Sequence, residues 1–267
     1  MNRLRWAALL VVLIVPLAFA SRVGAVKNGK LDGNLHPHVV LLLMEVDGQP
    51  AFRCSATLLS PTVVLTAGHC TGAAGEYSGM RVFTESDVEH GFNNYPYAGP
   101  NAVEAKEWHT HPLYETAPFF VHDVGVVILN DPIDLGTYGD LPEVNSLDAL
   151  KTQRGKQDVT FTSVGYGVQE INPVHITSEL IRMVANPRLI QINTPGFTGD
   201  FSLVLSNNHS TGGTCFGDSG GPNFLGDSNV VAGVTSFAIN GNCAGTGGVF
   251  RLDRQNVLDF VRSFLSP

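Results

Sequence analysis

Short apolar runs rich in β-branched residues recur along most of the chain, with Gly, Pro, Asn and Asp between them. Regularly spaced short strands with turn residues between them are typical of a β-sandwich or β-barrel. The pattern therefore predicts an all-β fold. The expected strands are Val39–Val46, Phe52–Leu59, Val63–Thr66, Val124–Leu129, Val159–Val164, Leu203–Leu205 and Val230–Phe237.

A helical pattern of useful length is found only at the C-terminal end. Val257, Val261, Phe264 and Leu265 fall on one face when they are spaced on a helix. Asp253 lies just before this segment, where an N-cap residue is expected. The sequence predicts a single C-terminal helix on a β body.

The first 25 residues have the composition of an export signal. Arg3 and Arg5 give a basic start, and Trp6–Ala20 is apolar apart from Pro16. The apolar run is short for a membrane span and nothing after it would anchor the chain. We expect residues 1–25 to be removed, leaving no stable membrane association.

Two positions fit a signal peptidase. Small residues stand at Ala18 and Ala20, and again at Val23 and Ala25. Cleavage at the first position leaves residues 21–25 as a short propeptide, whereas cleavage at the second exposes Val26 directly. In both cases the remaining domain is 26–267.

Composition describes a compact, acidic globule. Charged residues make up 15% of the chain, apolar residues 43%, and there are 29 glycines. The net charge is −8 and becomes −11 without residues 1–25, which hold three arginines and no acid. An acidic surface argues against nucleic acid or anionic membrane as a partner.

The four cysteines suggest two disulfides, because an exported chain with an even number usually pairs them. Three pairings are open. No metal site is expected, since the cysteine spacings are not C-x-x-C and the pair His109 and His111 has no third ligand. Four acids are interpreted as solvated surface groups rather than a calcium loop: Glu76, Glu85, Asp87 and Glu89.

Three segments carry the chemistry. Thr214–Pro222 holds Ser219 among glycines that free the backbone to aim N–H groups at one point. A serine needs a neighbouring base, and Thr66–Cys70 offers His69 on a similarly tight turn. His122–Leu129 places Asp123 at the start of an apolar strand. The order His, Asp, Ser is one in which this acyl-transfer chemistry occurs.

These segments resemble, one by one, those of the secreted trypsin/chymotrypsin-type serine proteases, and the resemblance runs from about residue 26 to 265. It implies two six-stranded antiparallel β-barrels with a C-terminal helix and an active site in the cleft between them. The N-terminal barrel would span about 26–140 and the second barrel with the helix about 150–267. The polar stretch Asp131–Lys156 is the expected linker.

The resemblance also implies roles. Ser219 would be the nucleophile of a serine endopeptidase without a cofactor, His69 its general base, and Asp123 the group that orients His69. The N–H groups of Gly217 and Ser219 would form the oxyanion hole. By the same resemblance the disulfides would be Cys54–Cys70 and Cys215–Cys243.

In the family, the aspartate before the nucleophile pairs with the α-ammonium group exposed by processing. Here this zymogen-type ion pair would join Asp218 to Val26. Lys27 departs from the family pattern, in which an apolar residue stands second, and its charge requires a route to water.

The specificity pocket is expected to take an uncharged, small to medium apolar residue. Its base would be Gly213, whereas relatives that cut after Arg or Lys carry aspartate there. Ala238 narrows the entrance by one methyl, and Phe237 stands where tryptophan is usual. The expected substrate-binding residues are Gly213, Thr214, Ser236, Phe237, Ala238 and Gly248, with Gly247 beside them.

The predicted protein is a secreted, extracellular monomer that acts on protein or peptide substrates. A catalytically silent homologue that binds proteins, and an esterase on the same scaffold, remain open as alternatives. An α/β-hydrolase is excluded, because its histidine follows its serine and none follows Ser219 here.

Overall fold

The computed structural model describes residues 26–114, 121–150, 158–172, 175–194 and 199–265. The predicted export signal, residues 1–25, and the end of the predicted linker, 151–156, lie outside the described residues. In the described part, no helix is both long enough and apolar enough to cross a membrane.

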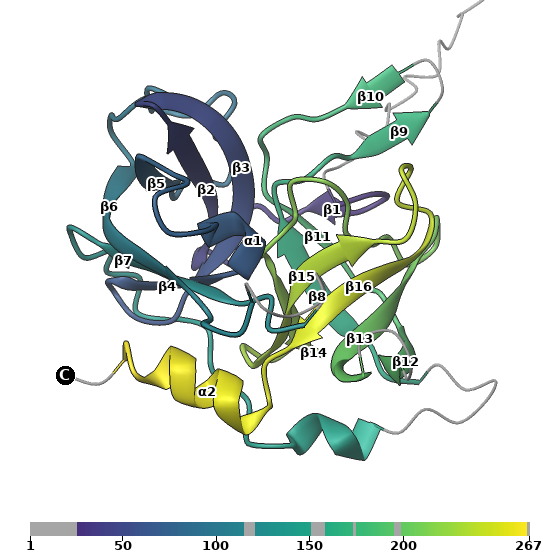
Figure 1. The fold of residues 1–267 in the computed structure, drawn as a ribbon. Coiled ribbons are helices and arrows are strands. Elements are labelled where there is room, and N and C mark those ends of the chain that lie inside the picture. The colour runs from purple at the N-terminus through teal and green to yellow at the C-terminus, as the bar shows by residue number, and fades with distance from the viewer. Residues whose placement is uncertain (1–25, 115–120, 151–157, 173–174, 195–198, 266–267) are drawn as a thin grey trace, which may run out of the picture.

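The first half of the chain forms a closed six-stranded barrel, as predicted (Figure 1). Neighbouring strands follow the order β2-β3-β4-β7-β6-β5 and every pair is antiparallel. The strands are β2 (Val39–Val46), β3 (Gln49–Leu58), β4 (Val63–Thr66), β5 (Gly79–Phe83), β6 (Ala102–Thr110) and β7 (Gly125–Leu129).

Strand β2 joins this barrel to the second half of the molecule. Its first six residues, Val39 to Met44, are all buried, so both of its faces are covered. Because side chains of a strand alternate between faces, one set fills the barrel while the other faces outward. Strand β8 (Phe161–Gly165) lies close to β2, and the Tyr166 hydroxyl after it bonds to the Val39 carbonyl at 3.3 Å.

The second half is an eight-stranded antiparallel sheet in the order β1-β11-β8-β14-β15-β16-β13-β12. Its other strands are β1 (Lys30–Leu31), β11 (Met183–Ala185), β12 (Leu189–Thr194), β13 (Gly199–Asn207), β14 (Pro222–Leu225), β15 (Val231–Ala238) and β16 (Gly245–Arg251). Strand β1 comes from the start of the domain, yet it pairs with β11 of this second sheet.

The predicted second barrel is present with one interruption. Strands β11 and β12 are separated by only three residues, Asn186 to Arg188, but they pair with β8 and β13 respectively. Pro187 lacks the N–H that a continuous strand would donate. The second sheet therefore stays open between β11 and β12, although the chain links these two strands directly.

Two further elements accompany the second sheet, a hairpin and a short helix. A separate hairpin of β9 (Glu170–Asn172) and β10 (His175–Thr177) projects from it (Figure 1). Ile171 of this hairpin packs on the Cys215 and Cys243 side chains. A short 3₁₀ helix, η1 (Ser146–Leu150), lies within the predicted linker.

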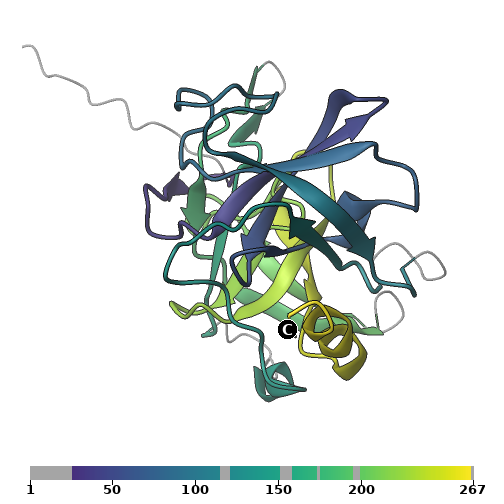
Figure 2. The same ribbon diagram turned by 90° about the vertical axis from the view of Figure 1, so that its left-hand side faces the viewer.

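Helix α2 (Gln255–Arg262) confirms the predicted C-terminal helix. Figures 1 and 2 place it along the outside of the two halves. The side chains of Val257 and Val261 on the inner face of α2 are fully buried. Phe260 of the same helix packs edge-on against His111, just beyond β6. The helix thus ties the second half to the first barrel.

The prediction that Asp253 caps α2 is wrong. Arg254 is the N-cap residue and makes no side-chain cap bond. Asp253 is completely buried, where it accepts hydrogen bonds from Arg251 and from the Leu147 amide at 2.9 Å. The charge-assisted hydrogen bonds between this carboxylate and a buried guanidinium are stronger than the bond that it could make to an N–H group at the helix end.

A second buried ion pair joins the two halves. Arg182 and Asp32 both have fully buried side chains, and Arg182 Nε donates to Asp32 Oδ2 at 2.9 Å. Arg182 also donates to the Val39 carbonyl at 2.8 Å and to the Gly33 carbonyl at 3.2 Å. The guanidinium therefore fixes the segment that leads into β2.

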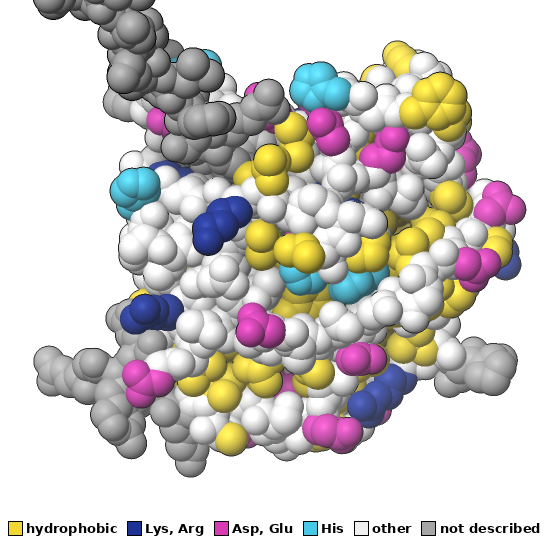
Figure 3. Space-filling view, turned by 180° about the vertical axis from the view of Figure 1, so that it is seen from behind, with side chains coloured by type: hydrophobic (Ala, Val, Ile, Leu, Met, Phe, Trp, Pro, Cys, Tyr) yellow, Lys and Arg dark blue, Asp and Glu magenta, His cyan; other side chains and the backbone are white. Residues whose placement is uncertain are grey.

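Charges on one face of the molecule are dispersed rather than gathered. On the face opposite to that of Figure 1, acidic side chains are scattered among neutral ones with a few basic residues between them (Figure 3). The prediction that nucleic acid is not a partner stays a prediction.

Candidate active site

His69 lies on α1 (Gly68–Thr71), a single helical turn that follows β4. The turn comes very close to Asp123. A Cβ on Gly68 would be 3.3 Å from Asp123 Oδ1 and 3.1 Å from the Val124 nitrogen, a tight approach that glycine relieves. The His69 amide donates to Asp123 Oδ1 at 2.9 Å, which fixes the backbone beneath the ring.

Asp123 is completely buried and binds the imidazole directly. His69 Nδ1 lies 2.9 Å from Asp123 Oδ2, and the Ser236 hydroxyl donates to the same oxygen. His122 has φ = 58°, and this tight turn before β7 directs the carboxylate inward. Nδ1 is thus the protonated nitrogen, which leaves Nε2 as the acceptor.

The electrostatics of His69 follow from this pair. Burial by itself lowers the pKa of His69, but the charge and the hydrogen bond of Asp123 together outweigh it. The net effect raises the pKa of His69 above its ordinary value of 6.5.

Ser219 is held on a bend that requires its glycines. Gly217 and Gly220 have φ of 93° and 76°, and a Cβ on Gly220 would lie 2.0 Å from Thr66 Oγ1. The Ser219 carbonyl accepts the Ser55 amide at 2.8 Å, so strand β3 of the first barrel supports the bend from below.

Two backbone N–H groups beside Ser219 are unpaired. The Phe216 carbonyl accepts the Val168 amide at 2.8 Å, and in a trans peptide the Gly217 N–H must then point the opposite way. Within the described part of the chain, neither the Gly217 N–H nor the Ser219 N–H has an acceptor. Donors left unpaired on a fixed bend can receive a developing negative charge.

His69 and Ser219 line one cavity of about 270 Å³. Of the predicted substrate-binding residues, Thr214, Ser236, Phe237 and Ala238 line it as well. Cys215, whose disulfide was expected at the rim of this pocket, lines it too, and two further lining residues were not predicted, although they flank the predicted positions in sequence: Phe216 and Thr235.

Gly213 and Gly248 do not line this cavity, because other side chains fill the space before them. A Cβ on Gly248 would lie within about 2.3 Å of three ring atoms of Phe237, so the ring rests on this glycine. A Cβ on Gly213 would be 2.4 Å from Cγ of Asn207, which is buried and donates to the Thr214 carbonyl. Sequence reasoning missed Asn207, since no local motif marks it.

A register shift explains the position of Phe237. Strands β15 and β16 pair Thr235 with Val249 and Phe237 with Gly248, which leaves Ser236 as an extra residue in a β-bulge. Cross-strand partners point to the same face. The bulge thus turns the Ser236 hydroxyl to Asp123 and the Phe237 ring onto Gly248.

Asp218 is buried without a directly bound cation in the described part of the chain. Its oxygens accept the amides of Gly167 and Cys215, each at 2.8 Å. Burial raises the pKa of Asp218 to about 7, although these two bonds and the charge of Arg53 lower it. The carboxyl is therefore a site where an additional positive charge would be stabilised.

Val26 is fully buried in a small apolar cluster. The side chains around it are those of Ile181, Met183 and Ala185. The charge of Lys27 is not buried, because its ammonium reaches the surface and donates to the Asn242 carbonyl at 2.6 Å. The predicted pair between Val26 and Asp218 stays a prediction, since its α-ammonium exists only after cleavage.

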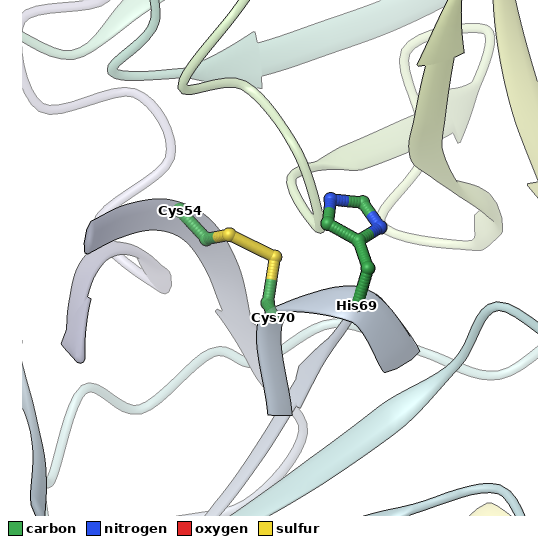
Figure 4. Close-up of side chains that lie close together, drawn as sticks. All are labelled: Cys54, His69 and Cys70. Carbon is green, nitrogen blue, oxygen red and sulfur yellow. A yellow bond between two sulfur atoms is a disulfide. The ribbon is translucent and has the colours of Figure 1, made fainter. Parts of the chain in front are cut away.

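Both disulfides implied by the resemblance are present, Cys54–Cys70 and Cys215–Cys243. Figure 4 shows the first beside the His69 ring, and the ligand atoms of these three residues lie within 4.8 Å of one another. Because both sulfurs are bound in the disulfide, this cluster is not a metal site as it stands.

The acids after Cys70 are used within the fold. Glu85 accepts the Phe92 amide at 2.7 Å and side-chain amides of Asn93 and Asn101. Asp87 accepts the His90 amide at 2.9 Å. Both carboxylates accept hydrogen bonds from N–H groups of their own loop. They therefore organise the loop, whereas a calcium ligand would be surrounded by other oxygen atoms.

Comparison with known proteins agrees with this fold. The trypsin family matches residues 29–260. The chain is 25% identical to a collagenase of Hypoderma lineatum over 84% of this chain and 81% of that protein. It is 28% identical to brachyurin of Leptuca pugilator over 79% and 84% of the two chains.

A venom protein and a solved structure extend the comparison. Snake venom serine protease KN8 of Trimeresurus stejnegeri is 26% identical over 79% of this chain and 77% of its own. The structure of HL collagenase superposes with a TM-score of 0.69 at 21% identity, covering 90% of this chain and 98% of the other. That likeness establishes the fold alone.

The fold and the family match define a serine protease of the chymotrypsin-like architecture. The chain belongs to the trypsin family, and it is a serine-type endopeptidase, a hydrolase that acts on protein or peptide substrates.

Proposed function

We propose that this protein is a secreted endopeptidase that cleaves peptide bonds through Ser219, His69 and Asp123 by way of an acyl-enzyme. The observation that carries the proposal is that the His69–Asp123 pair opens into the same cavity as Ser219. The two unpaired N–H groups on the Ser219 bend support it further.

In the first half of the reaction the Ser219 hydroxyl attacks the scissile carbonyl carbon while His69 Nε2 takes its proton. The carbonyl oxygen becomes an oxyanion, which accepts the N–H groups of Gly217 and Ser219. The intermediate collapses, the C–N bond breaks, and His69 returns the proton to the leaving amine.

In the second half a water molecule attacks the acyl ester. His69 takes a proton from the water and then gives it to the Ser219 oxygen as the ester bond breaks, which releases the acid product. Asp123 holds the imidazole in the required tautomer and stabilises its charged form in both halves.

Maturation is proposed to expose Val26 and to complete the oxyanion hole. Asp218 has a desolvated carboxyl with a raised pKa, and a new α-ammonium group would compensate that burial. Residues 1–25 would direct export and the domain would act outside the cell, as the composition of that segment indicates.

Labelling with a fluorophosphonate probe tests the nucleophile. We expect the mature protein to be labelled and to digest a denatured protein, because the probe phosphonylates an activated serine. Ser219→Ala should lose both signals, whereas Ser228→Ala, at an exposed turn, should keep both.

The other outcomes separate the alternatives. Labelling without digestion supports the esterase. The absence of both, in a correctly processed protein, supports the silent binding homologue. Labelling that survives Ser219→Ala contradicts the assignment of the nucleophile.

The specificity pocket is proposed to take a small uncharged residue before the cut. The Phe237 ring resting on Gly248 reduces the depth of the cavity, and no carboxylate lines it in the described part of the chain. A buried arginine or lysine would have no partner there.

Chromogenic peptides ending in Ala, Leu, Phe or Arg test this proposal. We expect kcat/KM to be highest for Ala and about 100-fold lower for Arg. Phe237→Ala should raise the relative kcat/KM for the Phe peptide, because it removes the ring above Gly248. A dominant preference for Arg would overturn the pocket assignment.

A further inference from the structure

Arg53 stands beside the nucleophile bend, on the first-barrel side. It belongs to β3, one residue before Cys54 and two before Ser55, whose amide binds the Ser219 carbonyl. Ser55 Oγ also donates to the Gly217 carbonyl at 3.0 Å. Through these bonds the strand fixes the position of Arg53 relative to the proposed oxyanion hole.

The guanidinium lies close to Gly217 itself. Arg53 Nε is 3.7 Å from the point that a Cβ on Gly217 would occupy. The Nη2 group donates to Ser178 Oγ, which holds the side chain in one orientation. Neither Nε nor Nη1 has an acceptor in the described part of the chain.

Arg53 also lacks a carboxylate partner in the described part of the chain. Four other arginines, Arg81, Arg182, Arg251 and Arg254, each lie within 4.0 Å of a carboxylate oxygen. The carboxyl of Asp218 is close enough to Arg53 for their charges to interact, but its oxygens already accept two backbone amides. A half-buried, oriented guanidinium with free donors is suited to bind a carboxylate.

A groove of about 400 Å³ begins at Arg53 and continues along the first barrel. Phe52, next to Arg53, is 57% exposed in it. The other lining residues are Leu43, Pro50, Ala51, Tyr95 and Pro96. This groove shares no lining residue with the specificity cavity, which lies against the second sheet.

The two sites fit the two sides of a scissile bond. The acyl part of the substrate occupies the cavity between Thr214 and Ala238. The leaving part departs from Ser219 away from that cavity, and Arg53 of β3 lies close to Gly217 without lining the cavity. An extended peptide advances about 3.3 Å per residue, so only the first few residues after the cut can reach the guanidinium.

We propose that Arg53 is a specificity-determining residue that binds an acidic side chain within the first three residues after the scissile bond. The proposal rests on the proposed function, because it requires cleavage at Ser219. The preferred substrate is a peptide with a small residue before the cut, an Asp or Glu soon after it, and apolar residues beyond for the groove.

Internally quenched peptides that carry Glu or Gln at the first, second or third position after the cut test the proposal. Glu and Gln are nearly equal in shape, so their ratio of kcat/KM reports the charge. We expect kcat/KM to be about tenfold higher for Glu than for Gln at one position, because a charge-assisted hydrogen bond contributes about that much. This ratio should decrease at high salt.

Variants assign that preference to one side chain. Arg53→Met should bring the Glu/Gln ratio close to one, and Arg53→Glu should instead favour a Lys peptide over the Gln peptide. Arg188→Met, which removes an exposed arginine outside both sites, should leave the ratio as in the wild type.

Fluorophosphonate labelling separates failure of this inference from failure of the proposed function. A labelled enzyme that cleaves Glu and Gln peptides equally, or cleaves neither, overturns the role of Arg53 and leaves Ser219 as the nucleophile. A Glu preference that persists in Arg53→Met also overturns it. A wild-type enzyme that is neither labelled by the probe nor able to cleave the peptides overturns both.

Discussion

Replacing His69 with alanine is expected to lower kcat by about 10⁶-fold with little change in folding. Without the imidazole, Ser219 has no group to accept its proton, and in triad proteases the loss of this one residue removes most of the catalysis. The residual rate should come from the N–H groups of Gly217 and Ser219, which the change does not touch. Steady-state hydrolysis of the best chromogenic peptide measures the effect.

The matched control is His209→Ala, which removes an exposed histidine from a turn of the second half and should leave kcat unchanged. The pH profile of the wild type provides a second check. His69 has to be neutral to act as a base, and its pKa is raised above 6.5. Activity should therefore fall as the pH drops through a value above 6.5, and an acid limb well below it would contradict the pairing with Asp123.

Replacing Asp32 with alanine is expected to destabilise the protein by about 3–5 kcal/mol. The change removes the only carboxylate that contacts Arg182 in the described part of the chain and leaves a fully buried guanidinium without a counter-charge. Arg182 joins β11 to the segment before β2, so the two halves should lose cooperativity together. Urea unfolding of the mature protein, followed by tryptophan fluorescence, measures the free energy of unfolding.

Asp227→Ala, which removes an exposed aspartate at a turn, serves as the control and should change the free energy of unfolding by no more than about 0.5 kcal/mol. A loss for Asp32→Ala as small as that of the control would mean that water or another group compensates Arg182. In that case the junction would depend on apolar packing rather than on the ion pair.

Local patterns were sufficient for two strands that are mostly apolar. Strands β2 and β4 have the predicted bounds, Val39–Val46 and Val63–Thr66, because β4 is buried throughout, β2 is buried from Val39 to Met44, and both end at turn residues. Strand β6 was not predicted, since its residues are only half buried and include three charged side chains. The second barrel was expected to be continuous, but Pro187 interrupts it.

The candidate site likewise has features that the sequence predicts and features that it does not. The glycines around Ser219 are demanded by the local backbone, so the motif predicts the bend wherever the rest of the chain lies. Arg53, Asn207 and the inward ring of Phe237 could not be predicted. Each owes its role to a glycine that no local motif places beside it: Gly217, Gly213 and Gly248 respectively.

The amino-acid sequence by itself determined the family and the β architecture with its final helix, and it pointed to the three chemical groups of the proposed site, since short motifs and apolar runs encode these locally. Only the tertiary structure decided that Asp253 binds Arg251 rather than capping α2, that the Phe237 ring rests on Gly248, and that Arg53 lines the groove without a carboxylate partner in the described part of the chain. The reason is that burial and charge pairing are properties of the assembled chain. A side chain takes its partner from whatever strand the fold brings beside it.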